Sequence, residues 1–265
     1  MVDTFVRLWD LTPDGTLLET RSSRLLPVRW RGLPAMLKIA VAEEEVRGGA
    51  LMRWWEGEGA ARVWERAGPA TLLERATGEA SLAEMAIGGR DDEASRLLCA
   101  AVQRLHAPRG GPMPDLVPLP HWFRSLATAA KEGGILARCA ETAEGLLAER
   151  QEPVALHGDI HHGNVLDFGR RGWLAIDPKG LLGDRAFDYA NLFCNPDPAW
   201  AVTPGRLARQ ACVVSESAGL ERVRLLRWIV AWAGLSAAFL LEDNDLAYLP
   251  LTLQVAEMAA ALEGA

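Results

Sequence analysis

Cysteine is scarce in this sequence, and its placement excludes two kinds of site. The four cysteines among the 265 residues are Cys99, Cys139, Cys194 and Cys212. No two of them form a C-x-x-C pair, so the sequence signals neither a zinc site nor a redox motif. Their density is also too low for a disulfide scaffold, and a reducing environment is the simple interpretation.

Long hydrophobic segments are lacking as well. A prominent uncharged and mostly apolar run, residues 229–241, has 13 residues. Such a run is too short to span a bilayer and predicts a buried helix. The first ten residues, MVDTFVRLWD, contain Asp3 and no apolar core segment, so they do not resemble a signal peptide. We therefore expect a cytoplasmic protein that makes no membrane contact.

The sequence also has no excess of basic residues. The chain has 28 Lys and Arg against 35 Asp and Glu, for a net charge of −7 and a pI near 5.4. A nucleic-acid partner is not expected, because such proteins usually present a basic face. An acidic balance suits a small cationic ligand, and it equally suits ordinary solubility. The 49% of apolar residues is normal for a globular protein with a core of its own.

The first 76 residues show the alternation and turn signals of β-strands. Strands are predicted at residues 16–20, 25–30, 35–40, 62–64 and 71–74. A helix over about residues 43–56 interrupts them. Its first turn carries Glu43, Glu44 and Glu45, which favours the positive end of the helix dipole. A switch to helical periodicity follows near residues 75–78.

Most of the remaining sequence follows a helical period. Helices are predicted over residues 91–106, 135–150 and 207–262, the last with a break near Gly219. Residues 109–120 hold four prolines and two glycines and predict a loop. A short strand at 153–156 and a hairpin of 165–168 with 173–176 interrupt the helices. The pattern predicts an α+β protein with a small β-rich lobe over residues 1–76 and a larger, mostly helical lobe over residues 77–265.

The strongest chemical signal is the segment LHGDIHHGNVL, residues 156–166. Asp159 and Asn164 lie five residues apart, which is the Asp-to-Asn spacing of the protein-kinase catalytic loop. There the Asp accepts the proton of the substrate hydroxyl and the Asn binds Mg²⁺. Asp177 follows thirteen residues after Asn164, directly after an apolar strand, where it can reach the same metal. Phosphoryl transfer needs this convergence of oxygen ligands, because negative charge spreads over the γ-phosphate oxygens.

Lys38 stands alone in the apolar strand Met36-Leu37-Lys38-Ile39, like the lysine of the kinase V-A-I-K motif. It could contact the α- and β-phosphates of a nucleotide. Such a lysine needs an acidic partner on the following helix. Glu44 and Glu45 both qualify, and Glu45 is favoured. Alone, Lys38 could equally extend its charge to solvent from a strand edge.

Together these residues resemble the aminoglycoside phosphotransferases, and within them the streptomycin 6-kinase (aminoglycoside/hydroxyurea resistance kinase) group. The resemblance covers about residues 15–240. The segments that carry it are LHGDIHHGNVLDFG, GWLAIDPKGLLGDRAFDYANL, AMLKIA, WWEGEGAARV, LLERATG and LLRWIVAWAGLSAA.

The resemblance implies a bilobal protein-kinase-like fold with ATP in the cleft, and phosphorylation of a cationic aminoglycoside, streptomycin at its 6-hydroxyl, to confer antibiotic resistance. It implies that Asp159 is the catalytic base, that Asn164 and Asp177 bind Mg²⁺, and that Asp188 orders the catalytic loop. The implied nucleotide-binding residues are Lys38, its partner Glu45, and the hinge backbone of Glu74, Arg75 and Ala76. The sequence leaves the oligomeric state open, with a monomer favoured.

Two departures from the pattern concern the phosphates. No G-x-G-x-x-G motif is present, and the equivalent turn would lie near residues 22–24. The second acid that this family frequently has after its I-D-P motif is replaced by Lys179. The second departure puts a second Mg²⁺ site in doubt.

Three alternatives stay open. A kinase of the same fold could act on another small alcohol or on hydroxyurea, and a nucleotide-binding pseudokinase could regulate without turnover. The Gly158-Asp159-Ile160-His161 segment also resembles a block of binuclear metallophosphoesterases. Those enzymes need further histidines downstream, and none follows His162, so His161 and His162 are expected to be structural or to support the site.

Two further groups of residues bear on the acceptor. Trp228 and Trp232 lie four residues apart on one helix face, where core packing is favoured over stacking against a sugar or guanidinium. Acidic side chains should line a pocket for streptomycin, which carries guanidinium groups. The candidates are Asp197, Glu216, Glu221, Glu242, Asp243 and Asp245.

Overall fold

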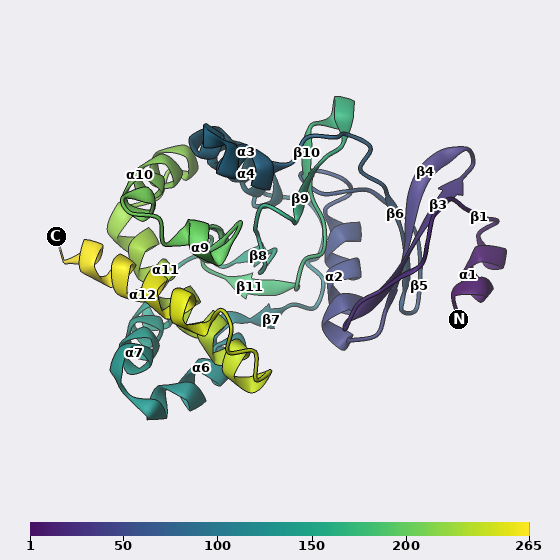
Figure 1. The fold of residues 1–265 in the computed structure, drawn as a ribbon. Coiled ribbons are helices and arrows are strands. Elements are labelled where there is room, and N and C mark those ends of the chain that lie inside the picture. The colour runs from purple at the N-terminus through teal and green to yellow at the C-terminus, as the bar shows by residue number, and fades with distance from the viewer. Residues whose placement is uncertain (265) are drawn as a thin grey trace.

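The computed structural model describes residues 1–264. A β-sheet forms one end of the molecule and a group of helices forms the other, with α2 between them (Figure 1). This arrangement confirms the predicted bilobal, protein-kinase-like α+β fold. The domain boundary between residues 76 and 77 remains a prediction.

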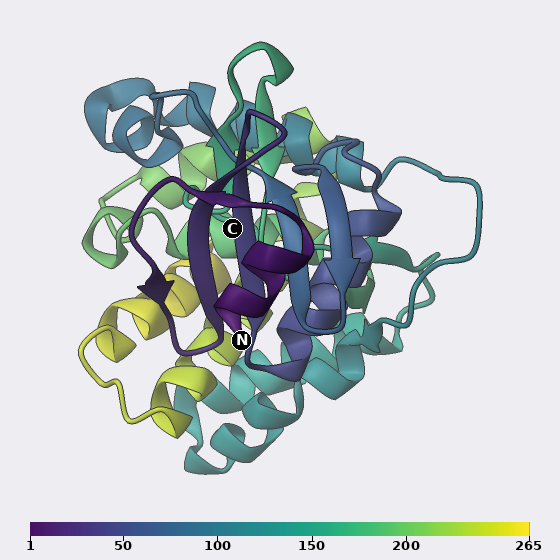
Figure 2. The same ribbon diagram turned by 90° about the vertical axis from the view of Figure 1, so that its right-hand side faces the viewer.

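The N-terminal sheet is antiparallel, with the strand order β1-β3-β4-β6-β5 and β2 paired to β3. Its strands are β1 (Thr12–Pro13), β2 (Leu18–Glu19), β3 (Ser23–Trp30), β4 (Leu33–Ala40), β5 (Val63–Ala67) and β6 (Ala70–Glu74). The strand predicted at 16–20 is thus only two residues long. Helix α1 (Val2–Leu8), which the sequence pattern did not predict, covers the outer face of this sheet with Phe5 and Val6 (Figure 2).

The two-residue period of β4 gives the sheet its two different faces. Ala35, Leu37 and Ile39 are fully or almost fully buried in the cluster beneath α1. Met36 and Lys38 point to the opposite face and line a cavity between the lobes. Strand alternation thus places the single lysine of an apolar strand in the cleft.

Helix α2 (Glu43–Trp54) joins the sheet to the rest of the molecule. Its residues Leu51 and Met52 belong to the large hydrophobic core of the helical lobe. The backbone of Gly48 lies close to Pro178. A Cβ atom added at Gly48 would come within 2.1 Å of the Pro178 carbonyl oxygen. A residue without a side chain therefore lets α2 approach the loop that carries Asp177.

The helical lobe is built around α11. Its helices are α3 (Leu82–Met85), α4 (Asp91–Leu105), α5 (Leu119–Trp122), α6 (Arg124–Ala129), α7 (Gly134–Ala148), α8 (Phe187–Ala190), α9 (Pro198–Ala201), α10 (Arg206–Ala218), α11 (Arg222–Glu242) and α12 (Leu249–Glu263). Within residues 1–264, α11 is the one helix long and apolar enough to cross a membrane by length and composition. It packs against α6, α7, α8 and α12, and 67% of its apolar window is buried, as expected for a core helix.

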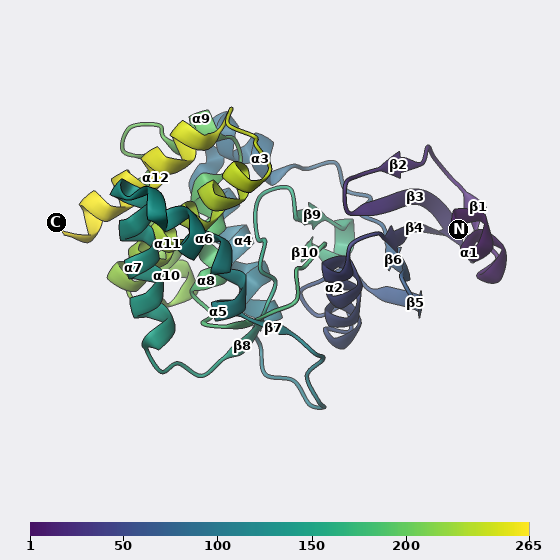
Figure 3. The same ribbon diagram turned by 90° about the horizontal axis from the view of Figure 1, so that it is seen from below.

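Two small sheets lie between the N-terminal sheet and the helices (Figure 3). Strands β9 (Val165–Asp167) and β10 (Trp173–Ala175) form the predicted hairpin, with Ala175 paired to Val165. Strand β11 (Leu181–Gly183) pairs in parallel with β7 (Val117–Pro118) and antiparallel with β8 (Val154–Leu156). The predicted loop at 109–120 therefore ends in a short strand and the start of α5.

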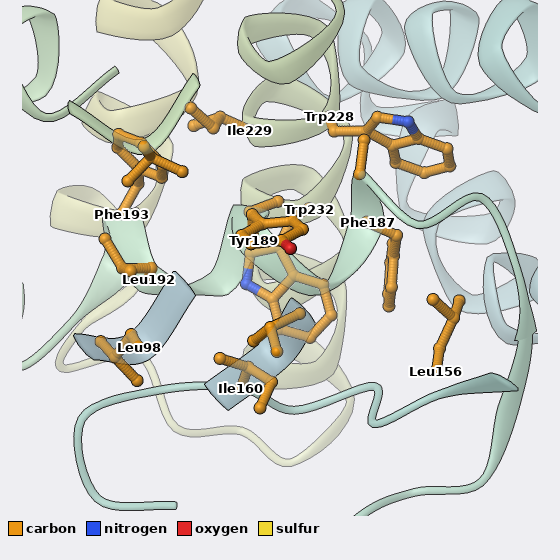
Figure 4. Close-up of a cluster of buried hydrophobic side chains, with 14 of the residues drawn as sticks. Leu98, Leu156, Ile160, Phe187, Tyr189, Leu192, Phe193, Trp228, Ile229 and Trp232 are labelled. Atoms are coloured by element: carbon orange, nitrogen blue, oxygen red, sulfur yellow. The ribbon is translucent and has the colours of Figure 1, made fainter. Parts of the chain in front are cut away.

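Aromatic side chains pack the catalytic loop onto α8 and α11. The ring of Phe187 lies edge-on to Trp228 at 5.5 Å and to Trp232 at 5.1 Å between centroids. Figure 4 shows Leu156 and Ile160, which flank the segment leading to Asp159, in the same buried cluster. Core packing is therefore the role of Trp228, as predicted. This packing gives the loop a rigid support.

Candidate active site

A buried carboxylate holds the catalytic loop in place. Asp188, only 1% exposed, accepts hydrogen bonds from the backbone N–H groups of His157 at 2.9 Å and Gly158 at 2.7 Å. Its Oδ2 also lies 2.8 Å from Nε2 of His106. Loss of Asp188 would leave two buried N–H groups unpaired, at a cost of about 1–3 kcal/mol each. The contacts confirm the structural role predicted for Asp188.

His157 links this loop to the end of β10. Its Nε2 lies 2.7 Å from the carbonyl oxygen of Ile176, and its Nδ1 accepts the backbone N–H of Asp159 at 3.2 Å. These two contacts correspond to the neutral ring with its proton on Nε2. Burial lowers the pKa of His157 and favours that form. The neutral ring ties the backbone of Asp159 to the strand that precedes Asp177.

Asp159 is oriented by two amides. Nδ2 of Asn191 donates to its Oδ1 at 2.8 Å, and Nδ2 of Asn164 donates to its backbone carbonyl at 2.9 Å. Asn191 is itself held by Trp232, whose Nε1 donates to the Asn191 Oδ1 at 2.9 Å. Burial raises the pKa of Asp159 to about 7, which suits a group that exchanges a proton near neutral pH.

The β9–β10 hairpin brings Asn164 and Asp177 together. The N–H of Ile176 donates to the carbonyl oxygen of Asn164 at 2.9 Å, so the residues just before β9 and just after β10 are neighbours. Asp177 has a positive φ of 64°, a conformation that a short polar side chain tolerates better than a branched one. Both residues predicted to hold Mg²⁺ therefore lie at the open end of one hairpin.

Lys38 reaches across from the N-terminal sheet to the same place. Its Nζ forms ion pairs with Oε2 of Glu45 and Oδ1 of Asp177. The Glu45 side chain is 1% exposed and that of Lys38 is 13% exposed. The structure thus selects Glu45, rather than Glu44, as the partner of Lys38. Burial alone would raise the pKa of Asp177, but the charge and hydrogen bond of Lys38 outweigh it and lower the pKa to about 2.

A cavity of about 390 Å³ separates the two lobes at this point. Lys38 and Asp177 are among the residues that line it. Its remaining wall combines polar residues of the β2–β3 turn with apolar residues of both lobes: Thr20, Ser22, Ser23, Leu25, Met36, Leu73, Leu166, Phe168 and Ile176. Glu74, Arg75 and Ala76, the predicted hinge, also line it. All five of the nucleotide-binding residues predicted from the sequence are therefore near this cavity, with Glu45 behind Lys38.

A second cavity, of about 700 Å³, is lined by Gly158, Asp159 and His161 of the loop that joins β8 to β9. It contains Asp159, and Ser22 lines both cavities. The other lining residues are acidic, aromatic or amide side chains for the most part: Glu44, Glu242, Asp243, Trp122, Trp232, Phe239, Asn191 and Asn195. A wall of this kind suits a cationic ligand with polar groups.

Two of the six acidic residues predicted as candidates for the ligand pocket line the second cavity, and four do not. Glu242 and Asp243 line the second cavity, and Asp243 pairs with Arg21 of the β2–β3 turn at 2.5 and 2.6 Å. Asp197 and Glu221 instead cap the N-termini of α9 and α11. Neither of them, nor Glu216 or Asp245, is among the residues that line this cavity.

The two histidines of the catalytic loop have different surroundings. His161 lines the second cavity and accepts the N–H of Gly163 through Nδ1 at 3.0 Å. His162 is 3% exposed, and neither ring nitrogen has a hydrogen-bond partner among the residues that the structure describes. Burial lowers the pKa of His161 to about 4 and that of His162 to about 3. Both are therefore neutral at physiological pH.

Asn191 is the site residue that the sequence reasoning missed. It contacts Asp159 from a position 32 residues downstream, in the segment GDRAFDYAN. The motif in that segment points to Asp188 and not to Asn191. The sequence did contain a signal for Asn191. It is a polar residue three positions after Asp188, so the two lie on the same helical turn.

Comparison with known proteins shows the family of this chain. Residues 8–244 match the family described as aminoglycoside/hydroxyurea antibiotic resistance kinase. The chain belongs to this family. Within it, the chain is 54% identical to a streptomycin 3''-kinase of Klebsiella pneumoniae over 89% of this chain and 91% of that protein. It is 32% identical to a streptomycin 6-kinase of Streptomyces griseus over 98% of this chain and 88% of that protein.

Solved structures show that the fold of this family member is shared more widely. A ternary complex of aminoglycoside phosphotransferase APH(4)-Ia with ADP and hygromycin B matches with a TM-score of 0.67 and 16% identity. The match covers 99% of this chain and 98% of that one. At this identity the likeness concerns the fold, and it agrees with the predicted kinase-like architecture.

Proposed function

We propose that this member of the aminoglycoside/hydroxyurea kinase family is a cytoplasmic, ATP- and Mg²⁺-dependent phosphotransferase that acts on streptomycin and confers resistance to it. The observation that carries the proposal is the position of Asp159. Its carboxylate lies in a large acidic and aromatic cavity, while Lys38 and Asp177 line a separate cavity between the lobes. This is the arrangement that transfer between a nucleotide and a second substrate requires.

Asp159 acts on the acceptor. Asn191 and Asn164 hold the side chain and backbone of Asp159, so the carboxylate meets an incoming hydroxyl in a preset orientation. In its ionised form it accepts the hydroxyl proton as the acceptor oxygen attacks the γ-phosphorus. Lys38 holds the α- and β-phosphates through its ammonium, which Glu45 keeps in place.

The residues at the hairpin end fit a magnesium ion. Mg²⁺ prefers oxygen ligands and usually takes one or two from protein, with phosphates and water supplying the rest. Nδ2 of Asn164 is directed to Asp159, so the amide oxygen is the group left for a cation beside Asp177. Asn164 and Asp177 would hold the ion, which when bound neutralises charge on the β- and γ-phosphates.

Streptomycin is proposed as the acceptor from the relatives and from the lining of the cavity. The 54% identical relative and the 32% identical relative both bear the name of a streptomycin kinase. Glu242 can pair with a guanidinium group, whereas Asp243 and Glu44 already pair with Arg21 and Lys179. Trp122 and Trp232 offer aromatic faces.

The hydroxyl that receives the phosphate is a separate question. The sequence motifs favoured the 6-hydroxyl. The higher identity to the 3''-kinase favours the 3''-hydroxyl, and we propose the 3''-hydroxyl for that reason. NMR of the purified product separates the two positions, since a proton–phosphorus correlation identifies the proton on the carbon that carries the phosphate.

The proposal is tested by ADP release from purified protein with ATP and Mg²⁺. Streptomycin, hygromycin B and hydroxyurea serve as acceptors in parallel, and streptomycin-dependent release is expected. Release with hydroxyurea alone would favour the other small-substrate kinase. Nucleotide binding without release on any acceptor would favour the pseudokinase.

A further inference from the structure

Lys179 is a charged residue of the site to which neither the motifs nor the family assigns a part. It follows Asp177 and Pro178, at the position where the sequence pattern frequently has an acid. Its backbone N–H donates to the carbonyl oxygen of His157 at 2.6 Å. The lysine is thereby fixed beside the catalytic loop from the Asp177 side.

The side chain of Lys179 is largely buried among carboxylates. It is 19% exposed, and its Nζ lies 3.4 Å from Oε1 of Glu44 and 3.3 Å from Oε1 of Glu45. The two nearby carboxylates favour the charged ammonium form of Lys179.

Glu45 holds two lysines that face different cavities. Lys38 contacts Oε2 of Glu45 and lines the cavity between the lobes. Lys179 contacts Oε1 of Glu45 and lines the cavity that contains Asp159. A phosphoryl group that leaves a nucleotide at Lys38 and meets a hydroxyl at Asp159 must pass from the first lysine toward the second.

We propose that Lys179 is a catalytic residue that donates hydrogen bonds to the γ-phosphoryl oxygens of ATP, an inference that rests on the proposed phosphotransferase function. In the transfer, the bond from the γ-phosphorus to the β–γ bridging oxygen breaks, and its electron pair leaves with ADP. The bond from the acceptor oxygen to phosphorus forms, and the hydroxyl proton passes to Asp159. Lys179 keeps its own protons and stabilises the negative charge on the three equatorial oxygens.

A purely structural role is the competing explanation. In that case Lys179 would only brace α2 through its ion pairs with Glu44 and Glu45. Glu44→Gln removes the first of these pairs and keeps the lysine, so a loss that comes from weaker bracing of α2 should appear in this variant too. Lys131→Met, at an exposed lysine of the helical lobe, is the matched control for loss of a positive charge.

The test is calorimetric titration of ADP and of AMP-PNP, each with Mg²⁺ and without acceptor. In Lys179→Met we expect the Kd of AMP-PNP to rise about tenfold and that of ADP to stay within about twofold, since only AMP-PNP has a γ-phosphoryl group. Lys179→Arg should recover part of the difference. Glu44→Gln and Lys131→Met should keep the wild-type ratio of the two Kd values. Lys179→Gln replaces Lys179→Met if the latter does not fold.

Equal weakening of both nucleotides in Lys179→Met, or the same selective loss in Glu44→Gln, would overturn the proposal. Because the titration needs no acceptor, its result is independent of streptomycin. A selective loss of AMP-PNP affinity in Lys179→Met, with no streptomycin turnover by the wild type, would support the role of Lys179 and reject streptomycin as the acceptor. Streptomycin turnover by the wild type, with unaltered nucleotide binding in Lys179→Met, would support streptomycin and reject the role of Lys179.

Discussion

At the residue scale, burial decides the protonation of the groups in the catalytic loop. Asp159 has a pKa of about 7, raised by burial. A base must be ionised, so kcat/KM should fall as the pH is lowered through about 7, by up to about tenfold per pH unit. A pH profile of the streptomycin-dependent reaction measures this. An acid limb centred near the ordinary aspartate value of about 4 would contradict it.

Replacement of the same residue separates chemistry from binding. Asp159→Ala should lower kcat by about 10²- to 10⁴-fold, the usual contribution of a positioned base. The affinity for ATP should stay within about twofold, because Asp159 lines the acceptor cavity and not the cavity of Lys38. Titration with ATP and Mg²⁺ checks the second part, and a parallel loss of affinity and turnover would argue against the role of base.

His162 gives a prediction about stability rather than activity. Its folded-state pKa of about 3 lies below the 6.5 of an exposed histidine, because of burial. The unfolded chain therefore binds the extra proton first, and the stability that this group contributes is lost as the pH falls below 6.5. The slope is at most about 1.4 kcal/mol per pH unit for one group.

His162→Leu removes that titration. Its free energy of unfolding, measured in urea at pH 7 and pH 5, should fall less between the two pH values than that of the wild type. His121→Leu, at an exposed histidine, serves as the control. An identical pH dependence in His162→Leu and the wild type would show that His162 is solvated in the folded protein.

At the scale of elements, the placement of α2 controls the charge cluster. The helix carries Glu44 and Glu45, and Gly48 lets it touch the Pro178 carbonyl. In Gly48→Ala the added Cβ would stand 2.1 Å from that oxygen, so α2 or the Asp177 loop must move. We expect a loss of about 1–3 kcal/mol in unfolding free energy and a larger proportional loss of activity. Thermal unfolding and ADP release measure the two effects.

Gly88→Ala is the matched control for this prediction. Gly88 has open space where a Cβ would stand, and its φ is not positive. This variant should keep both the stability and the activity of the wild type. Full activity in Gly48→Ala would mean that the contact between α2 and Pro178 does not position the site.

At the scale of the whole molecule, residues of both lobes line the cavity that we propose for the nucleotide. Leu25 and Met36 line it from the sheet, and Phe168 and Ile176 line it from the hairpin. Ligand that binds only the folded state stabilises it by about 2.7 kcal/mol at a hundredfold excess over Kd. ATP with Mg²⁺ should therefore raise the Tm by about 5–10 °C, given about 2–4 °C per kcal/mol in a protein of this size.

Asp177→Asn tests the part of that shift that depends on the metal. In the wild type, ATP with Mg²⁺ should raise the Tm more than ATP with EDTA. In the variant the two shifts should become nearly equal, because the carboxylate proposed to hold the ion is lost. A wild-type difference between the two conditions in Asp177→Asn would remove this residue from the metal site.

Much of the site could be predicted from the sequence because its parts are local. Asp159 and Asn164 share one loop, and Asp177 follows a hairpin whose two strands and connection are continuous in sequence. The two-residue period of a strand likewise orients Lys38 without knowledge of the rest of the fold. The family's motifs then supplied the roles expected of these residues and the bilobal architecture.

Only the tertiary structure decided which distant groups meet. It brought Asn191 to Asp159 and placed Lys179 between two glutamates. It also gave Lys38 the partner Glu45, which the sequence favoured without excluding Glu44. These contacts depend on how α2, α8 and α11 pack. Helical periodicity predicts which residues share a face of a helix, but it does not predict which residues that face contacts. The sequence alone therefore determined which candidate residues share the loop of Asp159 and Asn164, because they are local, whereas the packing of the helices determined the charges and cavity walls around that loop.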